Sequence, residues 1–150
     1  MSRDDRMPAA KERDQLREAQ AALARGWTLV ALRQKRPYHD GRGRPRWHRV
    51  MTYEAAQDLV NEGCNFGVDC GRSGLVVVDI DPRNGGSLDD AKRFPPTLTA
   101  ATGGGGLHLY FNAPGVKLAG KDRDGVTGQK QGIDVIGSGF VVMAPGFYLP

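Results

Sequence analysis

Long hydrophobic runs are absent from the sequence. Its apolar stretches, WTLVAL, GLVVVDI, LHLYF, IDVIG and FVVMAP, stay far below the roughly 18 apolar residues that a membrane-spanning helix needs. The polar start MSRDDRMPAAKERDQ also lacks the apolar segment of a signal peptide. We therefore expect a soluble, cytoplasmic protein that makes no use of a membrane. The short, β-branched runs bounded by Gly or Pro predict strands more than helices.

Cysteine is scarce as well, since the 150 residues include only Cys64 and Cys70. Structural zinc sites usually take cysteines in closely spaced CxxC pairs, which these two do not form. We therefore expect reduced thiols and no structural zinc. The sequence has no internal repeats, and its length suits one domain with a real core.

Acidic residues are almost missing from one stretch, RQKRPYHDGRGRPRWHR, at residues 33–49. Seven lysines or arginines stand there against one aspartate, a net charge of +6, whereas the whole chain has +4. Tyr38 and Trp47 are interleaved with Gly, Pro and Arg, which suits a flexible segment that touches nucleic-acid or polyphosphate backbone. A solvated loop is the alternative. Trp47 is expected in the core rather than stacked on a base.

The pattern of the remaining chain predicts one α+β domain at residues 8–150, after a flexible N-terminus at residues 1–7. Helices are predicted at 8–26, at 53–63 with Thr52 as cap, and at 87–94. Strands are predicted at 27–32, 98–102 and 107–112, a long loop at 113–131, and hairpins at 65–81 and 132–145. Because turns join most strands, we expect a largely antiparallel or mixed sheet with helices on one side.

The most apolar strand, in VVVDIDPRNGG, ends in two carboxylates, Asp79 and Asp81. Alternate side chains of a strand share a face, so both carboxylates lie on one face and Ile80 points back into the core. Like charges this close resist ionisation unless a cation lies between them, and Mg²⁺ prefers carboxylate oxygens. The alternative is a turn in which the aspartates make local hydrogen bonds.

Four glycines at 103–106 stand directly before the strand LHLYF. Glycines destabilise regular elements, so they indicate close approach of a phosphate or sugar to bare backbone N–H groups, or else a flexible loop. Alternation predicts that the leucines and the phenylalanine of LHLYF face the core while His108 and Tyr110 face the other side. The glycines make His108 a functional candidate; an ordinary core or surface histidine is the alternative.

Asp134 alternates with Ile133 and Val135 in GIDVIG, so its carboxylate faces away from the side that these two residues bury. If this strand lies beside the others, Asp134 joins Asp79 and Asp81 in a three-carboxylate cluster. Such a cluster can hold two metal ions about 3.5 to 4 Å apart, an arrangement suited to phosphoryl transfer.

Taken in order, DID at 79–81, TGGGGLHLYF at 102–111 and GIDVIGSGFVVMAPG at 132–146 resemble the N-terminal domain of bifunctional DNA primase/polymerases, in the archaeo-eukaryotic primase superfamily. KRP at 35–37 with Trp47, and NFGVDCGRSGLVVVDID at 65–81, are similar to that family's lysine-proline segment, its tryptophan and its glycine-containing hairpin. No single motif is specific. The resemblance rests on five motifs in the right order, from Gly26 to the end of the chain.

The resemblance implies a primase-like fold with an RRM-like catalytic core and a metal-dependent nucleotidyltransferase activity. Asp79, Asp81 and Asp134 would then be catalytic ligands of two Mg²⁺ or Mn²⁺ ions, and His108 would contact the phosphates of the incoming nucleotide. Nucleotide binding is further expected from Gly104, Gly105, Gly106 and Lys35, and nucleic-acid binding from Arg36, Arg42, Arg44 and Arg46. The implied partners are a single-stranded DNA template, dNTP or NTP, and a replicative helicase, fused or separate. Plasmids, phages and other mobile elements are the usual setting of the family.

The sequence also departs from the family pattern. Members often have a serine and a basic residue in the second motif, where this chain has Gly104 and Leu107, and an arginine where it has Ile136. Phosphate contacts would then fall to backbone amides, to His108, or to Lys121, Arg123 and Lys130 of the long loop. The chain stops soon after MAPG, where many members continue, so we expect either a C-terminally shortened or an unusually small version.

Two other functions remain open at this point. A non-catalytic module that binds single-stranded nucleic acid or nucleotide on the same fold would agree with these departures. The carboxylate cluster argues against such a module, because carboxylates without a bound metal ion repel the phosphates of a nucleotide or nucleic acid. A metal-dependent nuclease is the other alternative, because the same ions can activate water.

Overall fold

The structure, a computed structural model, describes residues 10–38, 47–113, 121–123, 132–143 and 147–148. The flexible N-terminus predicted at 1–7 lies outside these residues. The helices are α1 (Ala10–Ala24), α2 (Tyr53–Asn61) and α3 (Cys70–Ser73), with two 3-10 helices, η1 (Pro82–Asn84) and η2 (Leu88–Arg93). The strands are β1 (Leu29–Arg33), β2 (Arg36–Pro37), β3 (Arg49–Val50), β4 (Asn65–Asp69), β5 (Leu75–Ile80), β6 (Leu98–Ala101), β7 (Leu107–Asn112), β8 (Lys121–Arg123), β9 (Ile133–Ile136), β10 (Phe140–Val142) and β11 (Phe147–Tyr148).

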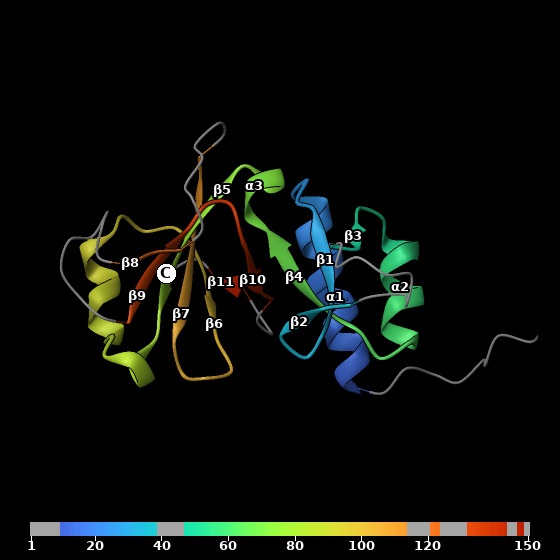
Figure 1. Ribbon diagram of the computed structural model, residues 1–150, viewed down its shortest axis with the longest axis horizontal. Helices are drawn as coiled ribbons and strands as arrows, with labels where there is room; N and C mark the ends of the chain where they lie inside the picture. Colours follow the sequence, from blue (N-terminus) through green and yellow to red (C-terminus); the bar gives the residue numbers. More distant parts are fainter. Residues whose placement is uncertain (1–9, 39–46, 114–120, 124–131, 144–146, 149–150) are drawn as a thin grey trace, which may run out of the picture.

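The described strands form two sheets whose pairs are antiparallel, which confirms the predicted α+β class. The first sheet has the order β10-β4-β1-β2, with β3 also paired to β1, and the second has the order β11-β6-β7-β5-β9-β8. Figure 1 shows α1 and α2 beside the first sheet, and η1 and η2 at the opposite end of the molecule, beside the second. The expectation of a single sheet with helices on one side is therefore wrong, because each sheet has its own helical cover.

Neither predicted hairpin forms. Both edges of β4 are taken, by β1 and β10 in the first sheet, whereas β5 pairs with β7 and β9 in the second. The GRSG segment is not a tight turn, because Asp69 caps the short helix α3 and Gly74 ends it with a φ of 65°. This helical turn carries the chain from one sheet into the other. The second hairpin fails likewise, since β9 belongs to the second sheet and β10 to the first.

The main hydrophobic core connects the two sheets with α1 and α2. It includes Leu16 of α1, Leu59 of α2, Phe66 of β4 and Val77 of β5, and it extends to β6, β7 and β9. A smaller core lies on the opposite face of the second sheet, where Val78, Ile80, Leu109 and Ile133 pack with Ala91 and Phe94 of the η2 region. The second sheet is therefore covered on both faces, which explains why β5 is apolar along most of its length.

Local signals placed the helices well. Leu16, Ala19 and Ala22 of α1 are buried and Leu23 is partly buried, and Gly26 follows the helix with a φ of 81°. The Thr52 hydroxyl accepts a hydrogen bond from the Ala55 amide at 3.2 Å, which confirms the predicted cap of α2. One correction concerns the loop predicted at 113–131, because Lys121–Arg123 within it is strand β8, paired with β9.

Candidate nucleotidyl-transfer site

Three neighbouring strands of the second sheet bring a histidine and two aspartates into one row. Asp79 of β5 is the register partner of His108 on β7 and of Asp134 on β9. Directly opposed residues of antiparallel strands project to the same face, with Cα atoms about 4.5 to 5.5 Å apart. The Nε2 atom of His108 lies 3.4 Å from Oδ1 of Asp79. The register therefore assembles three of the predicted site residues from segments that are far apart in the sequence.

The row of His108, Asp79 and Asp134 lies at the edge of the main core, on the face of the second sheet that this core covers. Along β5, Leu75 and Val77 share the face of Asp79 and are buried in that core. The Asp79 side chain, two residues further, is 24% exposed. The face that carries the row is thus continuous with the main core, whereas the alternation in LHLYF predicted the core on the opposite face. Asp79 lies at the border, where a carboxylate can stay hydrated on one side and be positioned by packing on the other.

Asp81, the next residue on this face, is turned toward the segment that follows it. Its Oδ1 atom accepts hydrogen bonds from the Arg83 amide at 3.0 Å and from Arg83 Nε at 3.4 Å. Its Oδ2 atom accepts from Asn84 Nδ2 at 2.7 Å. Slight burial would raise the pKa of Asp81, but the hydrogen bonds from Arg83, its positive charge and the bond from Asn84 lower that pKa below its ordinary value. Asp81 thus makes the local turn contacts that the sequence offered as the alternative to metal binding.

His108 is buried, with 7% of its surface exposed. Besides its contact with Asp79, the ring forms an edge-to-face contact with Tyr110, at 6.3 Å between centroids. Its second nitrogen, Nδ1, is buried and has no hydrogen-bond partner among the described residues. A buried polar atom without a partner costs about 1 to 3 kcal/mol. Nδ1 is therefore an atom to which a bound ligand or an ordered water would supply a stabilising hydrogen bond.

The four glycines form the turn between β6 and β7. Thr102 closes this turn through backbone bonds with Gly105 and Gly106, and its hydroxyl accepts from the Gly106 amide at 2.9 Å. A Cβ on Gly106 would collide with the Ile80 carbonyl oxygen, and one on Gly104 would lie 2.6 Å from Cζ of Arg83. At least two of the glycines therefore allow contacts within the protein itself. This internal reason was not among those the sequence suggested.

The fit of these residues to a divalent metal ion is partial. The described residues contain no group of three His, Cys, Asp or Glu side chains arranged to hold one. Asp79 and Asp134 nevertheless offer hard carboxylate oxygens from neighbouring strands, which is the donor type that Mg²⁺ and Mn²⁺ prefer. Asp81 would have to exchange its bonds with Arg83 and Asn84 to join them. The three-carboxylate metal site stays a prediction. The positions of Asp79 and Asp134 fit it directly, whereas that of Asp81 does not.

Strand β8 adds a basic residue to this end of the sheet. Its register places Arg123 opposite Asp134 on β9. The row of paired positions across the second sheet thus runs from His108 through Asp79 and Asp134 to Arg123. Lys130, the third basic residue considered for phosphate contacts, lies outside the described residues. The strand gives Arg123 a defined place that the sequence, which predicted a loop, did not give it.

The basic segment is fixed at both ends to the same edge of β1. β2 pairs with one end of β1 and β3 with the other. Arg36 and Lys35 are exposed, and Lys35 lies in the β1–β2 turn. Figure 1 shows this turn well apart from β5, β7 and β9, so the structure does not bring Lys35 to the row. Arg42, Arg44 and Arg46 lie outside the part of the chain that the structure describes.

The two aromatic residues of the basic segment contact protein groups. Trp47 is half-buried and packs edge-to-face on Phe140 of β10, with 5.1 Å between ring centroids. Tyr38 donates a hydrogen bond from its hydroxyl to Oε2 of Glu62 at 3.2 Å. The contact with Phe140 agrees with the expectation that Trp47 packs rather than stacks on a base.

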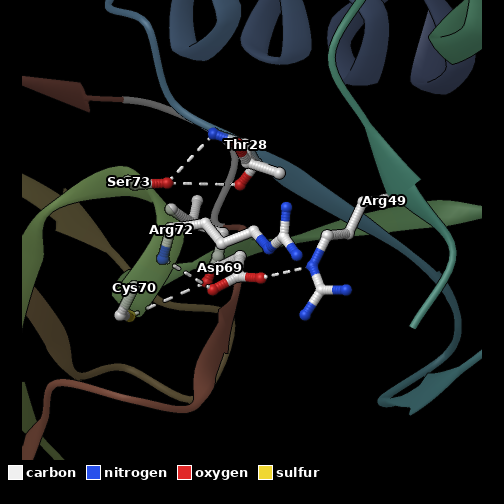
Figure 2. A network of polar contacts seen from close by, with 7 residues as sticks. Thr28, Arg49, Asp69, Cys70, Arg72 and Ser73 are labelled. Carbon is white, nitrogen blue, oxygen red and sulfur yellow. Dashed lines mark hydrogen bonds and ion pairs between the residues drawn. The ribbon is translucent and has the colours of Figure 1, made fainter. Parts of the chain in front are cut away.

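A polar network holds the junction between the two sheets (Figure 2). Asp69, only 2% exposed, accepts from Arg49 Nε at 3.0 Å and from the Arg72 amide at 3.1 Å. On the far side of α3, the Ser73 hydroxyl bridges the Thr28 amide and carbonyl, at 3.0 and 3.3 Å. Figure 2 shows the side chains of Arg49 and Arg72 reaching toward one another beside Asp69. Two arginines thus stand against one buried carboxylate, which makes the junction locally cationic.

Sequence reasoning did not single out Arg83 and Asp69. Arg83 comes two residues after Asp81, in DPRN, and a basic residue close to two aspartates was the available signal. Asp69 ends the strand NFGVD, directly before Cys70 and Gly71. Aspartate is a typical helix cap, but the predicted hairpin left it no such role.

A known protein family matches most of the chain. The family described as bifunctional DNA primase/polymerase, N-terminal, matches residues 19–149. The chain belongs to this family. The match includes all the strands and the whole Asp134–Asp79–His108 row of this Prim-Pol chain. A search of curated proteins found no match.

Membership in the Prim-Pol family associates the chain with DNA primase and polymerase function, and hence with DNA and nucleotides as substrates. Enzymes of this family are generally metal-dependent. No helix within the described residues is long and apolar enough to cross a membrane.

Proposed function

We propose that the chain is a metal-dependent DNA primase/polymerase domain. It would transfer nucleotides from dNTP or NTP to a primer or an initiating nucleotide, directed by a single-stranded DNA template. The observation that best supports this proposal is the row of Asp134, Asp79 and His108, aligned in register on three adjacent strands. Family membership supports the same reaction class.

Asp79 and Asp134 would hold the metal ions, with Asp81 as the third ligand once it releases Asn84 and Arg83. Two bound divalent ions supply activation of the attacking 3′-hydroxyl and stabilisation of charge on the transferred phosphoryl group. The protein itself contributes position: β5 and β9 fix the two carboxylates side by side, and the core behind Val77 keeps β5 rigid. Such rigidity favours catalysis because the oriented groups need no rearrangement during the reaction.

His108 would orient the triphosphate of the incoming nucleotide. The Asp79 carboxylate, 3.4 Å from Nε2, would help to fix the direction of the ring. The buried Nδ1 gains a partner when a ligand group reaches it. The exposed Arg36 and the neighbouring basic segment would contact the template backbone through charge rather than through base recognition.

A non-catalytic nucleotide-binding module on the same fold is the second candidate. The absence of a three-ligand metal group among the described residues favours it, as do the contacts that Asp81 makes with η1. Such a module would bind nucleotide or single-stranded DNA without forming product.

Incorporation of labelled nucleotides on single-stranded DNA, with and without a primer, in Mg²⁺ or Mn²⁺, tests the proposal. We expect metal-dependent product that falls at least about a hundredfold in an Asp79→Ala, Asp81→Ala double variant and in Asp134→Asn, because metal ligands are lost. Asp89→Asn is the matched control, because Asp89 is exposed and its only ion pair within the described residues is with Lys92 of η2. Nucleotide binding without any product would favour the binding module, and product that survives in both acidic variants would refute the metal-site assignment.

A further inference from the structure

The side chain of Arg83 lies between Asp81 and the glycine turn. Its Nε atom is 3.4 Å from Oδ1 of Asp81. Its guanidinium group is pressed against the backbone of Gly104, since a Cβ there would lie 2.6 Å from both Cζ and Nη2. Two contacts therefore hold this cation, one with Asp81 after the end of β5 and one with the β6–β7 turn.

The guanidinium group is held in place, yet most of its N–H donors remain available to a ligand. The Arg83 side chain is 63% exposed, and its ion pair with Asp81 is solvated, so the pair contributes little to stability. An arginine has five N–H donors, and Nε supplies only one of them. The two terminal nitrogens donate to no acceptor among the described residues. Their planar, forked geometry matches two oxygens of a phosphate group.

The turn beneath the arginine adds donors of a second kind. Gly105 and Gly106 donate to the backbone oxygen and the hydroxyl of Thr102. The amides of Gly103 and Gly104 donate no hydrogen bond within the described part of the chain. Backbone amides without an acceptor, next to a guanidinium group, favour an anion with several oxygens.

The absence of a side chain at Gly104 is what makes this arrangement possible. Any Cβ at this position would displace the guanidinium group from the turn. Gly104 thus leaves a space that an arginine from another segment occupies. Asp79, Asp81 and Asp134 would repel the phosphates of a nucleotide. A guanidinium group held here would offset that repulsion.

We propose that Arg83, seated on Gly104, binds the terminal phosphates of the incoming nucleoside triphosphate. This inference rests on the proposed function, because it takes the nucleotide to bind beside the Asp79 row. It assigns to the DPR segment a side-chain phosphate contact that the four glycines at 103–106 cannot make.

Equilibrium binding of fluorescent nucleoside tri-, di- and monophosphates to the full chain tests this assignment. We expect Arg83→Gln to weaken triphosphate binding about tenfold or more, because a charge-assisted bond is lost, and to change monophosphate binding much less. Arg83→Lys should restore part of the affinity through its charge. Arg93→Gln is the matched control, since Arg93 also pairs with an aspartate of its own 3-10 helix, Asp90.

Gly104→Ala provides a second, independent variant. It should weaken triphosphate binding in the wild-type background and have little further effect in Arg83→Gln, because the arginine it displaces is already gone. Thermal melting of each variant checks that the fold is kept. An equal loss of affinity for all three nucleotides, or no loss of affinity in Arg83→Gln while the wild type binds, would overturn only the Arg83 assignment. The proposed function would not be affected. A wild-type chain that binds no nucleotide would overturn the proposed function as well.

Discussion

The thiol of Cys70 follows directly after the buried carboxylate of Asp69, and it is itself fully buried. Burial, and then the negative charge of Asp69, raise the pKa of Cys70 from about 9 to about 12. The thiol therefore stays protonated and unreactive at neutral pH. Cys64 is buried too, and burial likewise raises its pKa.

The raised pKa of Cys70 predicts a specific loss of stability in alkali. Because the folded state holds this proton more tightly than the unfolded chain, the contribution is complete below about pH 9 and is lost as the pH rises toward 12. Urea unfolding at a series of pH values should show a free energy of unfolding that falls more steeply in the wild type than in Cys70→Ser, by at most about 1.4 kcal/mol per pH unit. Cys64 is present in both proteins and cancels. Parallel pH curves would contradict the assignment.

At the scale of elements, the β6–β7 turn, η1 and the end of β5 form one unit. Gly106 lies against the Ile80 carbonyl, and Gly104 against Arg83. On the other side of Asp81, Gly132 packs on the backbone of Gly86, and the Asp81 amide donates to the Gly132 carbonyl at 2.7 Å. Glycines from three segments thus let the backbone close tightly around the acidic end of β5.

Two glycines of the same turn should respond differently to substitution. Gly106→Ala forces a methyl group into the Ile80 carbonyl, so we expect a loss of about 1 to 3 kcal/mol in the free energy of unfolding. Gly103→Ala is the matched control, because a Cβ there meets no atom within 4 Å, and it should be neutral or slightly stabilising. Urea unfolding of both variants measures the difference. Similar values for the two would show that flexibility, not close approach, explains the glycines.

The sequence predicts these elements better than it predicts their partners. Period-two alternation located β5, β7 and β9 and the faces of Ile80 and Asp134, because that signal is local. The separation of β4 from β5 depended on the Asp69 cap and on pairing with β10, which comes from the far end of the chain. For the same reason Arg83 could not be placed on Gly104, since their contact depends on a sheet register that no single segment encodes.

At the scale of the whole molecule, charge is divided between the two sheets. The basic segment begins and ends on β1 of the first sheet, near the Arg49 and Arg72 junction, whereas Asp79, Asp81 and Asp134 belong to the end of β5 and to β9 in the second. A template strand would be attracted to the first sheet and kept from the acidic row unless metal ions neutralise it. This division supports separate places for template and nucleotide.

Single-stranded DNA binding should therefore depend on salt through the basic segment. Replacing Arg42, Arg44 and Arg46 by Gln should reduce the slope of log affinity against log salt concentration by about 2, because each phosphate contact on a single strand contributes about 0.7. Fluorescence anisotropy over a range of salt concentrations measures the slope. The matched control replaces Arg17, Lys92 and Arg93, which are outside the basic segment in the sequence and belong to α1 and η2. An equal change in both triple variants would mean that overall charge, not the segment, determines binding.

The return of β10 to the first sheet has a consequence for the chain as it leaves the ribosome. β4 is complete at Asp69, but one of its edges has no partner until Phe140–Val142 has been synthesised. Meanwhile β5, β7 and β9 must assemble elsewhere, in the second sheet. A nascent chain therefore displays an open, apolar strand edge for much of its synthesis, and such edges invite pairing with other chains. Occupation of that edge by a chaperone, or rapid translation of the last third, would protect the emerging protein from aggregation.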